Sequence, residues 1–221
     1  GYEIEGQLYN VDTLKYFEVL AGLDRARVLD RRFRGGDSRR MVWEVGGGWG
    51  GLAYQFKTLF PDVTYVITDF PELFLFSAVY LLTAFPGARV RIAGETPADE
   101  CLRDWQEADF IFLPQSRPDV IEEARPDLLL NTISFQEMTT QQVEFYVHRA
   151  FELGCPYLYS LNRDRSHHNR ELSNVRSIIG HDYWPHQIEV LPVSYTKMLD
   201  ADPDMPDRGY KHVLGWRRVR R

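Results

Sequence analysis

A glycine-rich segment constrains this chain more than any other feature. Residues 44–51 read Glu-Val-Gly-Gly-Gly-Trp-Gly-Gly, directly after the apolar run at residues 41–43 and before a stretch with helical periodicity. A glycine-rich turn between a strand and a helix lets a ligand approach the backbone closely. Asp69 closes the next apolar run, at residues 63–68, and a carboxylate at that place can bind a ribose diol. Together these features predict a site for an adenosine-containing cofactor.

The composition excludes some classes of function. The chain has 221 residues, of which 44% are hydrophobic and 14% aromatic, which suits one domain with a packed core. The formal net charge is −6, which argues against a surface that follows the phosphates of a nucleic acid. Basic clusters at residues 31–34 and 216–221 are expected to be a solvated linker and a tail. We therefore expect no nucleic-acid partner.

The chain carries no sign of secretion or of a membrane. Its two cysteines, Cys101 and Cys155, are too few and too far apart for a zinc site or a disulfide framework. The acidic first residues are unlike a signal peptide, and the longest uncharged stretch, residues 73–88, is short for a membrane span. We expect a cytoplasmic protein with no membrane partner. Gly1 in place of methionine suggests processing, or a domain cut from a longer chain.

Strand and helix signals alternate from residue 41 onwards. The expected strands are residues 41–45, 63–68, 109–113, 127–133 and 157–161, with residues 89–92 as a second candidate for the third strand. The expected helices are residues 52–60, 72–85, 140–153 and 171–179, with a short helical link at 119–124. Thr139 and Gln142 predict a capping box for the third of these helices, and Gly154 its end.

The two ends of the chain follow different patterns. Residues 2–9 predict a short strand or hairpin, and Asp12 can cap a helix that runs to about Gly22, with Leu14, Phe17 and Leu20 on one face. A basic linker at residues 31–40 follows. Near the other end, residues 188–193 and 211–216 are expected to form an antiparallel pair joined by the Asp/Pro-rich loop at 200–208.

These elements predict an α/β fold. We expect a doubly wound, Rossmann-like, seven-stranded sheet with a terminal antiparallel strand pair and an N-terminal helical cap. Residues 1–40 would form the cap and linker, and residues 41–221 the cofactor-binding core, within a single compact domain.

The glycines alone fit two cofactors. Gly46, Gly48 and Gly51 match the G-x-G-x-x-G pattern of nicotinamide dinucleotide sites, whereas Glu44 with Gly46, Gly48 and Gly50 matches the acid-x-G-x-G-x-G pattern of S-adenosylmethionine (SAM) sites. An acid before the turn suits the SAM ammonium better than a pyrophosphate. No tyrosine has a lysine four residues later, as short-chain dehydrogenases do, and no lysine follows the glycines as in a P-loop. The pattern favours SAM, with a nicotinamide cofactor as the alternative.

Three longer segments resemble one family. They are E-V-G-G-G-W-G-G-L-A at 44–53, Y-V-I-T-D-F-P-E at 65–72 and D-L-L-L-N-T-I-S-F-Q-E-M at 127–138. They are similar to the sugar O-methyltransferase family of class I SAM-dependent enzymes, as are residues 9–12 and 161–163, and the resemblance covers residue 8 to the end. It implies methyl transfer from SAM to a hydroxyl of a sugar or a glycosylated small molecule, in a chain that can form a homo-oligomer. The alternatives are an NAD(P)-dependent oxidoreductase and a non-catalytic SAM-fold module of a longer protein.

On this interpretation the cofactor lies along the carboxyl ends of the strands. Asp69 would accept hydrogen bonds from the ribose hydroxyls, Phe70 would flank the adenine, and Glu44 would hold the methionine ammonium. The other expected cofactor residues are Gly46, Gly47, Gly48, Leu113, Gln115, Asn131 and Ser134.

Two catalytic bases are open. The first is His167, next to His168 after the fifth strand, with Asp164 to orient it. The second is Glu137, which could also bind a sugar hydroxyl. Asp164 with nearby histidines is too small a ligand set to predict a metal.

Overall fold

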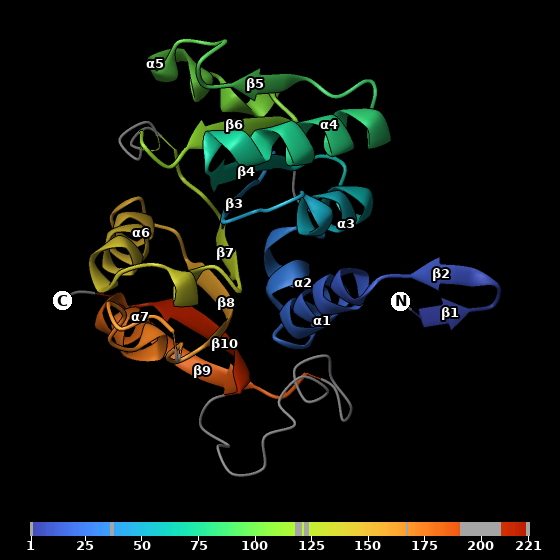
Figure 1. Ribbon diagram of the computed structural model, residues 1–221. Coiled ribbons are helices and arrows are strands. Elements are labelled where there is room, and N and C mark those ends of the chain that lie inside the picture. The colour runs from blue at the N-terminus through green and yellow to red at the C-terminus, as the bar shows by residue number, and fades with distance from the viewer. Residues whose placement is uncertain are drawn as a thin grey trace.

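The computed structural model describes residues 2–35, 38–117, 121, 124–166, 168–190 and 209–219 (Figure 1). Its centre is an eight-stranded sheet with the order β5-β6-β4-β3-β7-β8-β10-β9. The strands are β3 (Met41–Val45), β4 (Thr64–Asp69), β5 (Val90–Ile92), β6 (Phe110–Pro114), β7 (Leu128–Thr132), β8 (Tyr157–Arg163), β9 (Tyr183–Ile188) and β10 (Tyr210–Arg217). The predicted α/β, doubly wound architecture is confirmed.

The sheet is parallel over six strands and antiparallel at one end. β5, β6, β4, β3, β7 and β8 pair in parallel, and β10 runs antiparallel to both β8 and β9. Every residue of β3, β4 and β7 is buried, as expected for parallel strands covered on both faces. All the carboxyl ends of the parallel strands therefore meet along one edge of the sheet.

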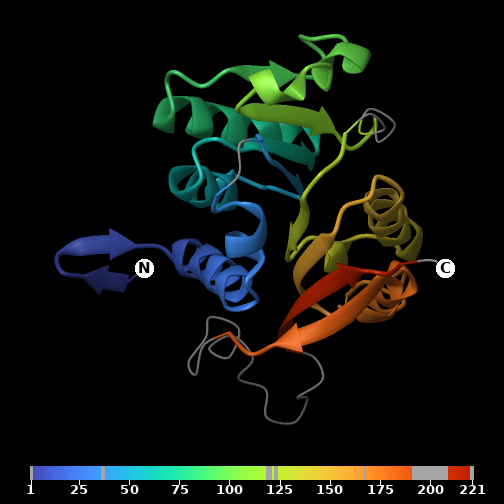
Figure 2. The same ribbon diagram turned by 180° about the vertical axis from the view of Figure 1, so that it is seen from behind.

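Helices form a layer on each face of the sheet (Figures 1 and 2). One layer contains α1 (Val11–Arg25), α2 (Val28–Arg32), α3 (Gly51–Leu59) and α4 (Phe74–Ala84), and the other contains α6 (Thr140–Glu152) and α7 (Val175–Asp182). The short helix α5 (Ala98–Cys101) packs Cys101 into the second layer's core. Successive residues of β3 serve the two cores in turn, because side chains alternate along a strand: Val42 packs with the first layer and Trp43 with the second.

The sheet has one strand more than the predicted seven, because residues 90–92 also form a strand. β5 pairs with β6 at the edge of the sheet, so both candidates for the third strand are strands and the sheet has eight. The predicted helical link at 119–124 lies mostly outside the described residues. The capping box is confirmed: Thr139 Oγ1 accepts from Gln142 N at 3.2 Å and Gln142 Oε1 accepts from Thr139 N at 2.9 Å.

The terminal antiparallel pair is confirmed, with one strand displaced. β10 matches the prediction, whereas β9 occupies Tyr183–Ile188 directly after α7 instead of residues 188–193. Pro185 lies within β9; proline is accepted there because β9 is an edge strand, whose outer N–H groups have no partner in the sheet. Residues 191–193 and the predicted loop at 200–208 lie outside the described residues.

The N-terminal cap departs from prediction in its details. The hairpin forms, as β1 (Tyr2–Ile4) and β2 (Gln7–Tyr9). Asn10, and not Asp12, caps α1, because Asn10 Oδ1 accepts from Thr13 N at 2.7 Å. The predicted apolar face is right at Leu20, which is buried, and wrong at Phe17, which is 56% exposed. The buried apolar face consists of Tyr16, Val19, Leu20 and Leu23.

Candidate functional site

The glycine-rich turn forms the floor of a cavity at the carboxyl edge of the sheet. It begins where β3 ends: Gly46 N donates to Thr68 O of β4 at 2.8 Å. Gly46 has a φ of 78°, in the left-handed region that side chains other than glycine rarely adopt. A Cβ on Gly46 would also overlap the Ser134 side chain. Only glycine therefore fits where the turn passes beneath the loop after β7.

Asp69, the last residue of β4, faces the turn as predicted. Its Oδ2 accepts from Gly48 N at 2.8 Å and its Oδ1 accepts from Phe70 N at 2.8 Å. Burial raises the pKa of this carboxyl above its ordinary value, and the two N–H groups oppose that rise. Each oxygen keeps a further lone pair. The side chain is thus held by the turn and can still accept a ligand hydroxyl.

A cavity of about 130 Å³ lies between these groups. Six of the predicted residues line it: Gly46, Asp69, Phe70, Gln115, Ser134 and Glu137. Its far wall was not predicted and includes Gln142 and Tyr146 of α6. Burial raises the pKa of Tyr146 to about 12, with the charge of Asp69 adding to the rise. The spacing of four residues, one helical turn, is the sequence signal that relates Gln142 to Tyr146.

Glu44 lies beneath the turn on the face that α1 and α3 cover. It is 1% exposed, and its Oε2 accepts from Tyr65 Oη at 3.0 Å. Its Oε1 is buried and has no hydrogen-bond partner among the residues that the structure describes. A Cβ on Gly47 would lie 3.3 Å from Glu44 Oε2, which places the carboxyl directly under the turn.

The environment of Glu44 favours its neutral form. Burial raises its pKa to about 8, and the nearby charge of Asp69 adds to the rise, while the Tyr65 hydroxyl opposes it. A carboxyl of this kind gains most from a cation that comes close to it, because the cation stabilises the charged form. Oε1 is therefore the carboxyl oxygen that is left to accept from a ligand, while Oε2, the one nearest Gly47, already accepts from Tyr65. The predicted contact of Glu44 with the cofactor stays a prediction.

Asn131 and Leu113 lie deeper than predicted. Asn131 is fully buried; its Nδ2 donates to Val45 O at 2.7 Å and its Oδ1 accepts from Asn162 Nδ2 at 2.8 Å. It links β3, β7 and β8 beneath the cavity instead of forming its wall. Leu113 is part of the core. Ile133, the first residue after β7, has a φ of 63°. This conformation is rare for a β-branched residue and is found most often at functional sites.

Of the two candidate bases, the structure describes only Glu137. Glu137 is exposed on the 3-10 turn Phe135–Glu137 and lines the cavity, where its Oε1 accepts from Gln136 Nε2 at 3.2 Å. Asp164 forms an ion pair with Lys211 Nζ of β10 at 2.5 Å. His167 lies outside the described residues, so its orientation by Asp164 stays a prediction.

Among the described residues, no group of three histidine, cysteine or acidic side chains is placed to hold a metal ion. Within that same part of the chain, no helix has the length and apolar character needed to cross a bilayer.

The chain is similar to known proteins in its fold and not in its sequence. No family model and no curated protein matches it. Among solved structures, an O-methyltransferase family protein from Burkholderia thailandensis matches with a TM-score of 0.57 at 13% identity, over 96% of this chain and 58% of that one. Human N-acetylserotonin methyltransferase in complex with SAM matches with a TM-score of 0.53 at 12% identity, over 93% of this chain and 52% of that one.

A third match is closer in length. The magnesium protoporphyrin IX methyltransferase of Synechocystis PCC 6803, with bound S-adenosylhomocysteine, matches with a TM-score of 0.55 at 10% identity, over 97% of this chain and 90% of that one. The chain spans little more than half the length of the first two solved structures. These likenesses show that the chain has the fold of the SAM-dependent methyltransferases.

Proposed function

We propose that this chain binds SAM and transfers its methyl group to a hydroxyl group of a small molecule. One observation carries the proposal: the glycine turn after β3 and the carboxylate at the end of β4 meet at a single cavity on the carboxyl edge, where Asp69 accepts from Gly48 N at 2.8 Å. Ligands of open α/β sheets bind at this edge. The shared fold with SAM-bound methyltransferases supports the same assignment.

The residues around the cavity suit the parts of SAM. Asp69 would accept hydrogen bonds from the ribose hydroxyls, and Phe70 and Gln115 would border the adenine. Glu44, whose carboxyl lies under Gly47 and whose Oε1 has no partner among the described residues, would bind the ammonium group. Asn131 positions the turn from below through Val45 O.

The chemistry requires alignment and exclusion of water more than a strong catalyst. SAM supplies a methyl group on a positively charged sulfur. The protein must hold the acceptor oxygen in line with that group and keep water away, because charge disappears in the reaction. Met138 and Tyr146 provide apolar walls for this purpose. Glu137, exposed at the rim, would accept the hydroxyl proton, and His167 is the alternative base.

The acceptor is proposed to be a sugar or a glycosylated small molecule. This part of the proposal rests on the sequence resemblance, above all on residues 127–138. The loop after β7, which contains Ser134 and Glu137, lies in that segment and borders the cavity.

Calorimetric titration with S-adenosylhomocysteine tests the proposal. We expect saturable binding to the unmodified chain and a loss of at least about tenfold in Asp69→Ala, since a hydrogen bond to a charged group contributes about 1.5–3 kcal/mol. Asp62→Ala is the control, because Asp62 is an exposed aspartate near the opposite end of β4. Unchanged binding in Asp69→Ala would remove that carboxylate from the site.

Parallel titrations with NADH and NADPH separate the alternatives. Binding of a nicotinamide cofactor alone would replace the methyltransferase by an oxidoreductase. Binding of none of the three compounds would support a non-catalytic module.

A further inference from the structure

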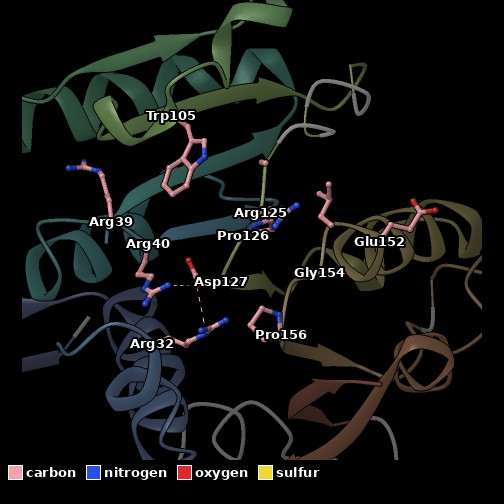
Figure 3. Close-up of a pocket in the computed structure, with 12 residues that line it drawn as sticks. Arg32, Arg39, Arg40, Trp105, Arg125, Pro126, Asp127, Glu152, Gly154 and Pro156 are labelled. Carbon is pink, nitrogen blue, oxygen red and sulfur yellow. Dashed lines mark hydrogen bonds and ion pairs between the residues drawn. The ribbon is translucent and has the colours of Figure 1, made fainter. Parts of the chain in front are cut away.

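A second, larger cavity lies at the opposite edge of the sheet. Its volume is about 760 Å³ (Figure 3), within the usual range of small-molecule sites. Its residues precede the strands: Arg40 comes directly before β3, Arg125 and Asp127 come before β7, and Arg32 ends α2. At about 3.3 Å per residue, Arg40 is roughly 20 Å along the strand from Gly46. The two cavities are therefore separate sites.

Among the described residues, the centre of this cavity holds two guanidinium groups against one carboxylate. Asp127 Oδ1 lies 3.6 Å from Arg32 Nε and 3.5 Å from Arg40 Nη1, so one carboxylate faces two guanidinium groups (Figure 3). Its Oδ2 already accepts from Met41 N at 3.0 Å. Arg32 Nε is buried and has no hydrogen-bond partner in the described part of the chain. A further anion would satisfy that group.

The other charged residues that line the cavity do not neutralise the two guanidinium groups. Glu152 is paired outside the cavity, with Arg149 at 3.3 Å. Arg39 is paired with Asp109 at 2.5 Å. Arg125 is exposed and forms no ion pair with any residue that the structure describes. A positive cavity of this kind stands out on a chain with a formal net charge of −6.

One aromatic ring completes the cavity. Trp105 belongs to the 3-10 turn Trp105–Glu107 that precedes β6, and it is half-buried. Figure 3 shows its indole extending into the cavity from the side opposite Arg32. An indole face offers a surface on which a planar ring can stack.

We propose that the arginine pocket, formed by Arg32, Arg40, Arg125, Asp127 and Trp105, is a second ligand site. It takes a small anion in which a phosphate or carboxylate group is attached to a molecule with a planar ring. Guanidinium groups bind such anions through paired, charge-assisted hydrogen bonds. The proposal goes beyond methyl transfer and stands whether or not the carboxyl-edge cavity binds SAM.

Three probes test both parts of this ligand description. Calorimetric titrations would use inorganic pyrophosphate, uridine monophosphate (UMP) and uridine. We expect saturable binding of pyrophosphate and UMP that weakens as salt is added, and at least about tenfold weaker binding of uridine, which lacks the anion. Saturating S-adenosylhomocysteine should not displace UMP. Displacement would place UMP at the carboxyl edge and overturn the proposal.

Arginine variants identify the site. Arg40→Gln should weaken UMP binding by about tenfold or more without changing the response to S-adenosylhomocysteine. Arg125→Gln is a second test, because an exposed side chain that forms no ion pair with the described residues can be replaced without harm to the fold. Arg103→Gln is the control: Arg103 is exposed and does not line the pocket. Absence of binding, equal binding of uridine and UMP, or unchanged UMP affinity in both pocket variants would overturn the proposal.

Discussion

The two edges of one sheet present opposite chemistry. The carboxyl edge holds a cavity of about 130 Å³ made of a glycine turn and a buried acid, whereas the amino edge holds a cavity of about 760 Å³ surrounded by arginine side chains. We expect recognition at the first edge to depend on backbone shape, since a Cβ on Gly46 would overlap Ser134. We expect recognition at the second to depend on charge carried by long side chains. One added carbon atom in the turn should therefore greatly weaken ligand binding at the first edge, whereas loss of one side chain at the second should weaken it only in part.

Acidic groups show the same contrast. At the carboxyl edge Glu44 accepts from the Tyr65 hydroxyl, and burial raises its pKa to about 8 although the charge of Lys15 opposes that rise. Near the amino edge, burial also acts to raise the pKa of Asp109, but hydrogen bonds from the Arg89 N–H and from Lys57 hold it well below its ordinary value. Burial thus dominates the pKa of Glu44, whereas hydrogen bonds and cationic neighbours outweigh burial at Asp109.

The largest effect is expected for Gly46→Ala. The new Cβ would overlap Ser134 in a backbone conformation with a φ of 78°. We expect the affinity for S-adenosylhomocysteine to fall by about 100-fold or more, given strain of about 1–3 kcal/mol in addition to the overlap. Calorimetry measures the affinity, and circular dichroism shows whether the sheet remains intact.

Two further variants make this prediction specific. Gly87→Ala is the control, because Gly87 has open space around it. Adding Ser134→Gly to Gly46→Ala removes the overlapping side chain and should restore part of the affinity. If the double variant binds no better than Gly46→Ala, the overlap is not the cause.

An effect of another kind, on stability and not on binding, is expected for Glu44→Gln. The folded state holds a proton on Glu44 up to about pH 8, whereas the unfolded state releases it near its ordinary pKa of 4.5. The unfolded state thus binds fewer protons in this window, so the free energy of unfolding of the ligand-free chain falls as pH rises from about 5 to 8. Glutamine does not titrate, so the decrease in the free energy of unfolding over this pH range should be smaller by a few kcal/mol, at about 1.4 kcal/mol per pKa unit.

Denaturant unfolding from pH 5 to pH 9 measures this difference. Glu44→Gln should be more stable than the unmodified chain at the alkaline end. Glu137→Gln is the control, because Glu137 is an exposed acid at the same edge. Parallel stability curves for Glu44→Gln and the unmodified chain would mean that Glu44 is ionised throughout.

The doubly wound architecture and most of its elements could be predicted from the sequence, whereas details that depend on contacts between distant residues could not. The strand, turn and helix around Gly46 follow from residues adjacent in the chain, as does the capping box of α6. Asn10 and Asp12 are both good helix caps by residue type. Asp12 is instead drawn to Trp49, whose Nε1 donates to it at 3.1 Å from a position 37 residues away. Similarly, β9 is placed by its pairing with β10.

The candidate sites divide in the same way. Asp69 and Ser134 were predicted because each ends or follows an apolar run. Tyr146 was missed because only the packing of α6 brings it to the cavity. Asn131 was expected to bind the cofactor at the end of its strand, which stays a prediction; its buried amide bonds to Val45 O and to Asn162, contacts that the sequence does not reveal. The basic run at 31–34 was expected to be a solvated linker, yet Arg32 ends a helix and lines the arginine pocket.

The smallest effect is expected for Trp105→Leu, which separates the two parts of the arginine pocket. Leucine keeps an apolar contact but loses the stacking surface, so UMP affinity should fall by about fivefold, corresponding to roughly 1 kcal/mol. Pyrophosphate affinity should not change, because pyrophosphate has no ring. Trp184→Leu is the control, since Trp184 is exposed on β9 and does not line the pocket. An equal loss for both probes would instead show that Trp105 supports the arginines, and the amino edge would then recognise charge alone.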